Sequence, residues 1–81
     1  MPLTDADIRR IYGQRISEAR LTEGLTQADL AERLTAAGVD TSPQDVSRWE
    51  VGAVAPRDRA RHALALILSP DLFEAPNEAV A

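Results

Sequence analysis

Apolar residues recur along this chain at intervals of three and four, the spacing that places them on one face of an α-helix. Several segments show this pattern, and glycines or prolines separate them from one another. No segment shows the alternation of apolar and polar residues that marks a half-buried strand. The sequence therefore predicts an all-α fold of short helices joined by well-marked turns.

The first predicted helix begins at Thr4 or Asp5 and ends before Gly24, a residue suited to a left-handed helix end. Thr4 and Asp7 have the spacing of a capping box, with Asp in place of Glu. Gly13 lies inside this segment and weakens its helical pattern. Its apolar positions share one face: Ile8, Ile11, Tyr12, Ile16 and Ala19.

Two shorter helices follow. The second begins at Thr26 and ends at Gly38, with Asp29 as another capping partner and Leu30 and Leu34 facing inward. The third covers about residues 43–51, with Ser42 as N-cap and a proline at the first helical position, where its missing N–H is tolerated. Its inward residues are Val46 and Trp49, and Gly52 ends it.

A loop at 51–56 leads into the fourth predicted helix, whose inward face is made of Ala60, Ala63, Leu64, Ile67 and Leu68. Ser69 and Pro70 open a last short turn of helix that carries Leu72 and Phe73. The expected architecture is a compact domain of four to five helices over residues 1–75, followed by a disordered tail at 76–81.

The composition excludes several classes of function. A chain of 81 residues builds one modest core and no large enclosed pocket. It has no cysteine, and its single histidine, His62, cannot form a metal cluster by itself. The sequence shows no nucleophile–base set and no glycine-rich phosphate loop. We therefore expect no enzymatic activity, no cofactor and no metal.

The charge balance and apolar content constrain the partners. A formal net charge of −4 argues against non-specific nucleic-acid binding but allows a specific site with a favourable local field. All nine basic residues are arginines, which suit bidentate contacts to phosphate and guanine, although GC-rich codon usage also gives this bias. No apolar run approaches the ~18 residues of a membrane span, and the start of the chain lacks a signal-peptide pattern. We expect no membrane association and a cytoplasmic location.

Three segments occur in a fixed order and spacing: Gly24-Leu25-Thr26-Gln27 with Leu30-Ala31, then Gly38-Val39 with Ser42 and Val46, then Ser47-Arg48-Trp49-Glu50 with Gly52 and Pro56. Together they resemble the lambda-repressor-like (Cro/repressor-type, XRE family) helix-turn-helix domains, over roughly residues 8–72. The resemblance implies a phage or bacterial transcriptional regulator, located in the bacterial cytoplasm or nucleoid. The third predicted helix would then enter the major groove of operator DNA.

The resemblance also implies roles for single residues. Gln27 would contact a phosphate and support the third helix, and Gln44 would read a base, since its amide can pair with adenine. Ser47 and Arg48 would lie further along the reading face, with Arg48 reaching guanine or phosphate. Arg20 and Glu50 would form an internal ion pair. None of these roles follows from composition or spacing alone.

Other polar positions leave two interpretations open. Asp45 could accept a hydrogen bond from cytosine, but an acid at this position more often caps the helix. Among the arginines that begin the fourth helix, Arg57 is the best candidate for a phosphate contact, and a solvated face is the alternative. Arg9 and Arg10 are expected to be solvated.

The sequence departs from the family pattern in two ways. Asp40 and Thr41 lengthen the turn between the second and third helices, so the tilt of the third helix can differ. Pro43 replaces a polar reader and cannot donate a hydrogen bond, which shifts base reading to Gln44, Asp45, Ser47 and Arg48.

The expected partner is a double-stranded DNA operator, bound by a homodimer. Leu72 or Phe73 would contribute to the dimer contact, or both would close the core of one copy. A two-fold dimer predicts a palindromic operator with half-sites about one DNA turn apart. The alternative is a protein-binding module on the same scaffold, such as an antitoxin or adaptor, and a regulatory protein partner also remains open.

Overall fold

The computed structural model describes residues 2–75, and within them the chain forms four helices and no strand. These are α1 (Asp5–Thr22), α2 (Gln27–Ala36), α3 (Pro43–Glu50) and α4 (Asp58–Ile67). The all-α class predicted from the apolar spacing is confirmed. The expected tail at 76–81 lies outside the described residues.

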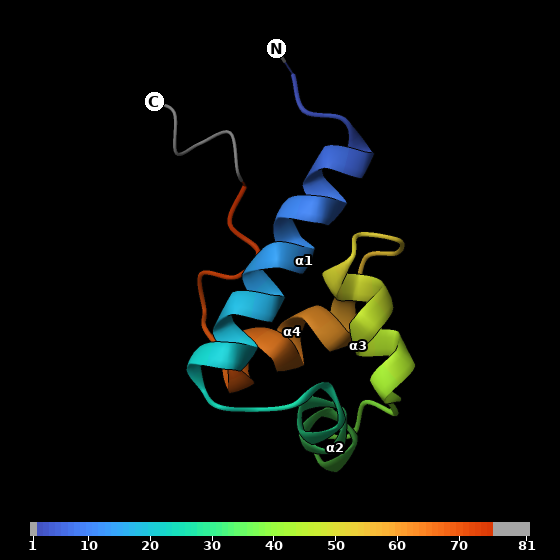
Figure 1. The fold of residues 1–81 in the computed structure, drawn as a ribbon, viewed down its shortest axis with the longest axis vertical. Coiled ribbons are helices and arrows are strands. Elements are labelled where there is room, and N and C mark those ends of the chain that lie inside the picture. The colour runs from blue at the N-terminus through green and yellow to red at the C-terminus, as the bar shows by residue number, and fades with distance from the viewer. Residues whose placement is uncertain (1, 76–81) are drawn as a thin grey trace.

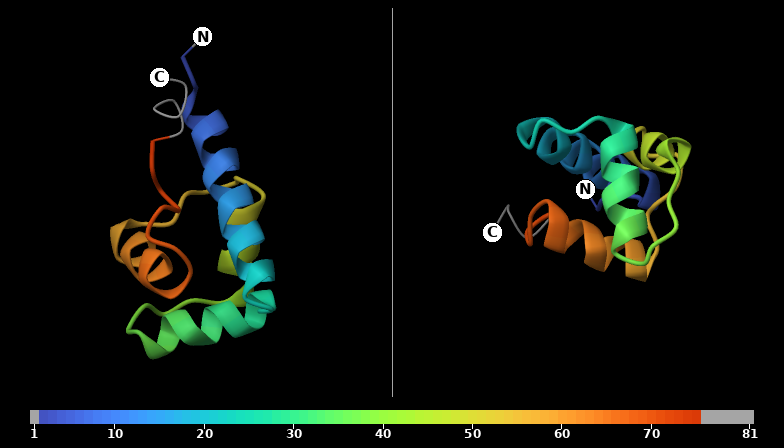
Figure 2. Two further views of the ribbon diagram at one scale, coloured as in Figure 1. Left: turned by 90° about the vertical axis from the view of Figure 1, so that its left-hand side faces the viewer. Right: turned by 90° about the horizontal axis from the view of Figure 1, so that it is seen from below.

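The helices enclose one core from several directions. In Figure 1, α1 runs roughly along the longest axis, α3 lies to one side of it, and α2 lies below, seen end-on. The left view of Figure 2 shows α2, in green, running across the C-terminal end of α1. The two views of Figure 2 show α4 and the C-terminal turns, in orange to red, on another side of α1. Helix α3 packs against both α1 and α2, and α2 also contacts α4.

The core is built from the apolar positions that the helical spacing predicts. Ile16, Leu30, Leu34, Val46 and Leu64 are the largest fully buried side chains, with at least one from each helix. Trp49 lies in the same cluster and is 8% exposed, which agrees with its expected core position rather than with base stacking.

Three of the four helices begin in the same way. Thr4, Thr26 and Ser42 each accept a hydrogen bond from the backbone N–H three residues on, and an aspartate there accepts one from the cap residue's N–H. This cap N–H is the main reason why the pKa of each aspartate is lowered, because it stabilises the charged carboxylate. The aspartates are Asp7, Asp29 and Asp45.

The same three helices end at glycines with positive φ. At the end of α2, Gly38 has φ 94°, its N–H donates to Thr35 O, and the Val39 N–H donates to Leu34 O. This pair of bonds is the Schellman arrangement, in which glycine avoids the steric cost that a Cβ would add. The first three helices therefore end within one or two residues of the positions predicted from the sequence.

Gly13 has a role that the apolar pattern does not predict. It is buried where α1 crosses the C-terminal end of α3, and a Cβ there would stand 2.7 Å from the carbonyl oxygen of Glu50 and closer still to that of Trp49. The missing side chain allows the two backbones to approach. A residue that weakens helix formation locally is thus required by packing.

The segment after α4 differs from the expected helical turn. Its backbone bonds span three residues, from Leu72 N–H to Ser69 O and from Glu74 N–H to Asp71 O, so it forms successive turns. The Arg15 Nη1 group donates to Leu72 O at 3.1 Å and to Glu74 O at 2.8 Å, which ties these turns to α1. No helix within residues 2–75 is both long and apolar enough to cross a membrane.

The C-terminal turns also close the core. Leu72 is only 3% exposed and joins the core cluster. Phe73 is half-buried and packs edge-to-face on Tyr12, with 5.2 Å between ring centroids. The sequence left open whether these residues form a dimer contact or close the core of one copy. Leu72 closes the core of one copy.

Candidate nucleic-acid interface

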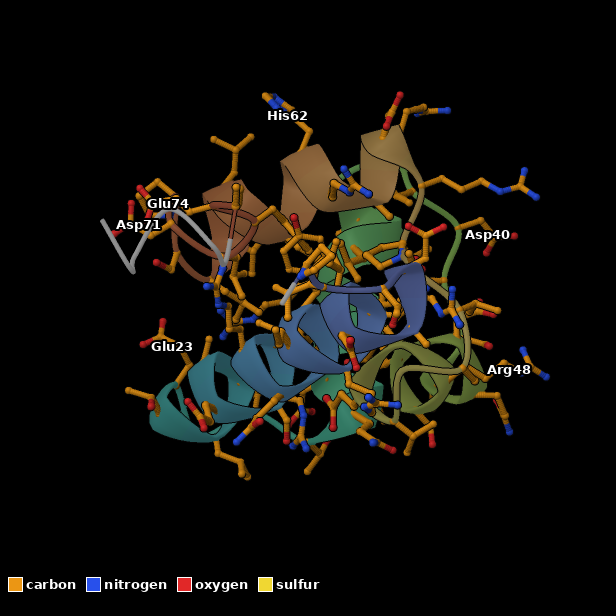
Figure 3. The ribbon with its side chains drawn as sticks, turned by 90° about the horizontal axis from the view of Figure 1, so that it is seen from above. Glu23, Asp40, Arg48, His62, Asp71 and Glu74 are labelled. Carbon is orange, nitrogen blue, oxygen red and sulfur yellow. The ribbon has the colours of Figure 1, made fainter. Side chains whose placement is uncertain are left out.

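Helix α3 has one buried face and one exposed face. Val46 and Trp49 anchor it in the core, whereas Gln44 and Arg48 are exposed. Ser47 and Asp45 are half-buried at the margin of the exposed face. Figure 3 shows the Arg48 side chain pointing away from the body of the protein. The structure thus places four of the predicted site residues along one accessible edge of α3.

Arg20 and Glu50, paired by the family resemblance, are in direct contact. The Arg20 Nε group donates to Glu50 Oε2 at 2.7 Å and its Nη2 group donates to Glu50 Oε1 at 3.0 Å. The two side chains are 11% and 8% exposed. The hydrogen bonds to Glu50 raise the pKa of Arg20 above its already high ordinary value, so it remains charged.

Two further bonds extend this pair into a network. The Gln27 Nε2 group donates to Glu50 Oε1 at 3.1 Å, and Arg20 Nη1 donates to Leu25 O at 2.8 Å. Glu50 therefore connects the last residue of α3 to α1 and to the first residue of α2. A charged pair that is bidentate and nearly buried fixes geometry well, so the network holds α3 in one orientation. The Gln27 amide is part of this support.

Asp45 takes the capping role that the sequence left as one of two interpretations. Its Oδ2 atom accepts a hydrogen bond from the Ser42 N–H at 2.9 Å. The Nη1 group of Arg48 approaches Asp45 Oδ1 at 3.3 Å, with the two side chains 60% and 41% exposed. Such an exposed pair is weak, so the Arg48 side chain is free to exchange this contact for another.

The long turn between α2 and α3 is held by two threonines whose pairing the sequence did not predict. The Thr41 N–H donates to Thr35 Oγ1, and the Thr35 hydroxyl donates to Thr41 O, both at 3.2 Å. The Thr41 hydroxyl in turn donates to Val39 O at 2.7 Å. Two threonines six residues apart give no pattern in the sequence, so only the folded turn reveals the pairing.

The arginines at the start of α4 point to different surroundings, as expected of neighbouring positions on one helix. Arg57 is the exposed N-cap residue and makes no capping bond with its side chain. Arg59 Nη2 donates to Gly38 O at 2.9 Å and so braces the long turn. The guanidinium of Arg61 lies over the rings of Tyr12 and Phe73, 5.7 and 5.6 Å from their centroids.

Arg9 departs from the solvated position expected for it. It is half-buried, and its Nε group donates to Gly52 O at 3.2 Å, just after the end of α3. Arg10 follows the expectation more closely, since it is exposed and pairs with Asp7. Among residues 2–75, no three carboxylate or imidazole groups gather closely enough to hold a metal ion.

The fold defines a small all-α domain in which a short helix with a polar outer edge is fixed on two others. Comparison with models of protein families, with curated proteins and with solved structures finds no match.

Proposed function

We propose that this protein is a sequence-specific DNA-binding transcriptional regulator with a lambda-repressor-like helix-turn-helix, and that α3 enters the major groove. The observation that carries the proposal is the anchoring of α3. Its apolar face is locked by Val46 and Trp49, its end is fixed by Glu50, and its remaining edge is polar and exposed. A rigid helix with a free polar edge is what major-groove recognition requires.

The dimensions and side chains of α3 suit this role. An α-helix with its side chains is about 10–12 Å in diameter, which fits the ~12 Å width of the B-DNA major groove, and the eight residues of α3 extend about 12 Å along it. Gln44 lies near the helix start, where HTH proteins contact base edges, and its amide can bond adenine in a bidentate way. Arg48 lies one turn further along and can bond guanine or a phosphate, while Ser47 at the margin can bond either kind of base.

Contacts to the DNA backbone would come from neighbouring elements. Arg57 is exposed at the junction of the α3–α4 loop and α4, and Gln27 lies at the start of α2. Asp45 and the net charge of −4 oppose phosphate binding. Affinity would then depend on matched base contacts more than on general attraction, which favours specificity.

The test is selection of bound sequences from a random duplex pool at near-physiological salt, with wild type and Arg48→Ala in parallel. A matched control is Arg10→Ala, because Arg10 also pairs with a capping aspartate three residues earlier and is 64% exposed, against 60% for Arg48. Both variants lose one positive charge. We expect wild type and Arg10→Ala to enrich the same palindromic motif and Arg48→Ala to lose it.

Equal enrichment by all three proteins would remove Arg48 from the interface. Enrichment of no sequence at any salt concentration would overturn the proposal. The second candidate, a protein-binding module on this scaffold, would then take its place. The net charge of −4 and the position of Asp45 at the margin of the exposed face of α3 favour that candidate.

A further inference from the structure

The α3–α4 loop, residues 51–56, has no side chain that can bind a phosphate. Its residues carry neither a charge nor a side-chain hydrogen-bond donor: Val51, Gly52, Ala53, Val54, Ala55 and Pro56. Val51 is 69% exposed and lies three residues after Arg48 and seven after Gln44, so it continues the exposed edge of α3. The loop thus begins where the proposed reading edge ends, and a cation at this end of α3 has to come from another element.

Arg9 of α1 supplies a cation at this end of α3. Its Nε group donates to Gly52 O at 3.2 Å, and among residues 2–75 its two Nη groups have no hydrogen-bond partner. Figure 1 shows the loop, in yellow, beside the N-terminal half of α1. Gly13, one turn after Arg9 on the same side of α1, lies where α1 crosses the end of α3. The crossing of the two helices therefore holds Arg9 against the end of α3.

The surroundings of Arg9 leave its positive charge available to a ligand. Within the described part of the chain none of the ion pairs includes Arg9, whereas its neighbour Arg10 pairs with Asp7. Arg9 also lines a hollow between α1 and the loop, together with Arg61 and Asp5. Two arginines against one aspartate give this hollow an excess of positive charge, on a protein whose formal net charge is −4.

We infer that the Arg9 guanidinium binds a phosphate of the DNA backbone beside the end of α3, and this inference rests on the proposed function. In HTH domains the first residues of the recognition helix meet the base edges, so its C-terminal end lies nearer the groove rim, where the phosphates are. The carbonyl groups at a helix C-terminus carry partial negative charge, which repels a phosphate. Arg9 offsets this charge at Gly52 O and offers its Nη groups to a phosphate oxygen in a charge-assisted contact.

The bond from Arg9 to Gly52 also stabilises the end of α3 by itself, because a cation is favourable at a helix C-terminus. A phosphate contact and a purely structural cap differ in their salt dependence. A phosphate contact releases counterions from DNA, so its loss makes the slope of log K against log salt shallower by about 0.9. The loss of a cap leaves this slope unchanged. Neither role carries base information, so the selected motif stays the same in both cases.

The test measures binding at several salt concentrations to a random-sequence duplex pool and to any duplex that wild type enriches from it. Arg9→Gln removes the charge but keeps an amide that can donate to Gly52 O, so thermal melting should show it folded. We expect its slope to be shallower by about 0.9 for each bound copy. The advantage of wild type should then shrink about 3.5-fold per copy between about 50 and 200 mM salt. Arg9→Lys keeps the charge and should keep the slope.

The matched control is Arg33→Gln. It removes the same charge from an exposed arginine in the last turn of α2, at the opposite end of that helix from Gln27. If the effect of Arg9 is a local contact rather than a change in net charge, Arg33→Gln should bind with the wild-type slope.

Three results would overturn the inference: a wild-type slope for Arg9→Gln, an equal loss of slope in Arg33→Gln, or a slope for Arg9→Lys as shallow as that for Arg9→Gln. The proposed function fails separately, if wild type enriches no sequence but binds the random pool with a slope that depends on Arg9. A wild type that binds no duplex at any salt concentration overturns both.

Discussion

The buried pair of Arg20 and Glu50 gives the sharpest prediction about stability. Glu50→Ala removes a carboxylate that accepts three hydrogen bonds, two from Arg20 and one from Gln27. It leaves a guanidinium that is only 11% exposed with one remaining acceptor, Leu25 O. Breaking a buried pair by removing one partner costs about 3–5 kcal/mol, and the bond to Leu25 places the expected loss near the lower end, about 3 kcal/mol.

This loss is large for a domain of this size. At ~0.05–0.15 kcal/mol per residue, the whole chain is stable by only about 4–12 kcal/mol. Glu50→Ala can therefore fail to fold, and Glu50→Gln serves as the second variant. Its amide keeps the size of the side chain and one acceptor for Arg20 but loses the charge, so we expect a cost of roughly 1–3 kcal/mol.

The assay is urea denaturation followed by the fluorescence of Trp49, the only tryptophan, which is buried next to the network. Glu32→Ala is the control, because it removes the same charge from an exposed position on α2 and should change the free energy of unfolding by less than about 0.5 kcal/mol. Replacing both partners, as in Arg20→Met with Glu50→Leu, should recover part of the loss. Unfolding midpoints for Glu50→Ala and Glu50→Gln equal to that of Glu32→Ala would refute the reasoning.

Three further predictions concern the packing, the caps and the proposed interface. Gly13→Ala should lower the free energy of unfolding by about 1–3 kcal/mol, since its Cβ would overlap the end of α3, and an unchanged melting temperature would contradict that close approach. The folded pKa of Asp29 lies below its ordinary value of 3.8, so its carboxylate stabilises the fold above that pH and the contribution is lost as the pH falls further. Asp29→Asn should thus make the free energy of unfolding fall less steeply as the pH is lowered into the acid range. A fall as steep as in wild type would show that the Asp29 carboxylate does not contribute to this loss of stability. Gln44→Ala should weaken specific DNA binding by about 1–3 kcal/mol without changing the melting temperature, whereas Gln14→Ala, an exposed glutamine on α1, should change neither.

Local signals in the sequence predict the helices well because the chain repeats one local design. A Thr or Ser followed three residues later by Asp starts three helices, and a glycine with positive φ ends each of them. These bonds are made within a few residues, so they do not depend on the rest of the fold. The expected helix after Pro70 shows the limit of the method. Apolar residues occur there, and the Ser69 hydroxyl oxygen accepts a hydrogen bond from the Asp71 N–H at 3.3 Å, but the backbone bonds span only three residues and the segment forms turns.

In the candidate site, too, local signals predict the positions of some residues and not of others. The apolar spacing of α3 by itself places Val46 and Trp49 inside, and this leaves Gln44 and Arg48 outside. The contact of Arg20 with Glu50 joins positions 30 residues apart, and no local rule could supply it. It was expected only because the motifs resemble those of a known family.

The sequence alone thus determined the helical class, the ends of the first three helices and the core residues that these helices and α4 contribute, since each follows from periodicity or from hydrogen bonds between near neighbours. Only the tertiary structure decided that Gly13 permits the crossing of α1 and α3, that Thr35 and Thr41 hold the long turn, and that Leu72 closes the core while Leu66 stays exposed. The physical reason is that these features depend on which segments meet in space, and such contacts leave no periodic trace along the chain.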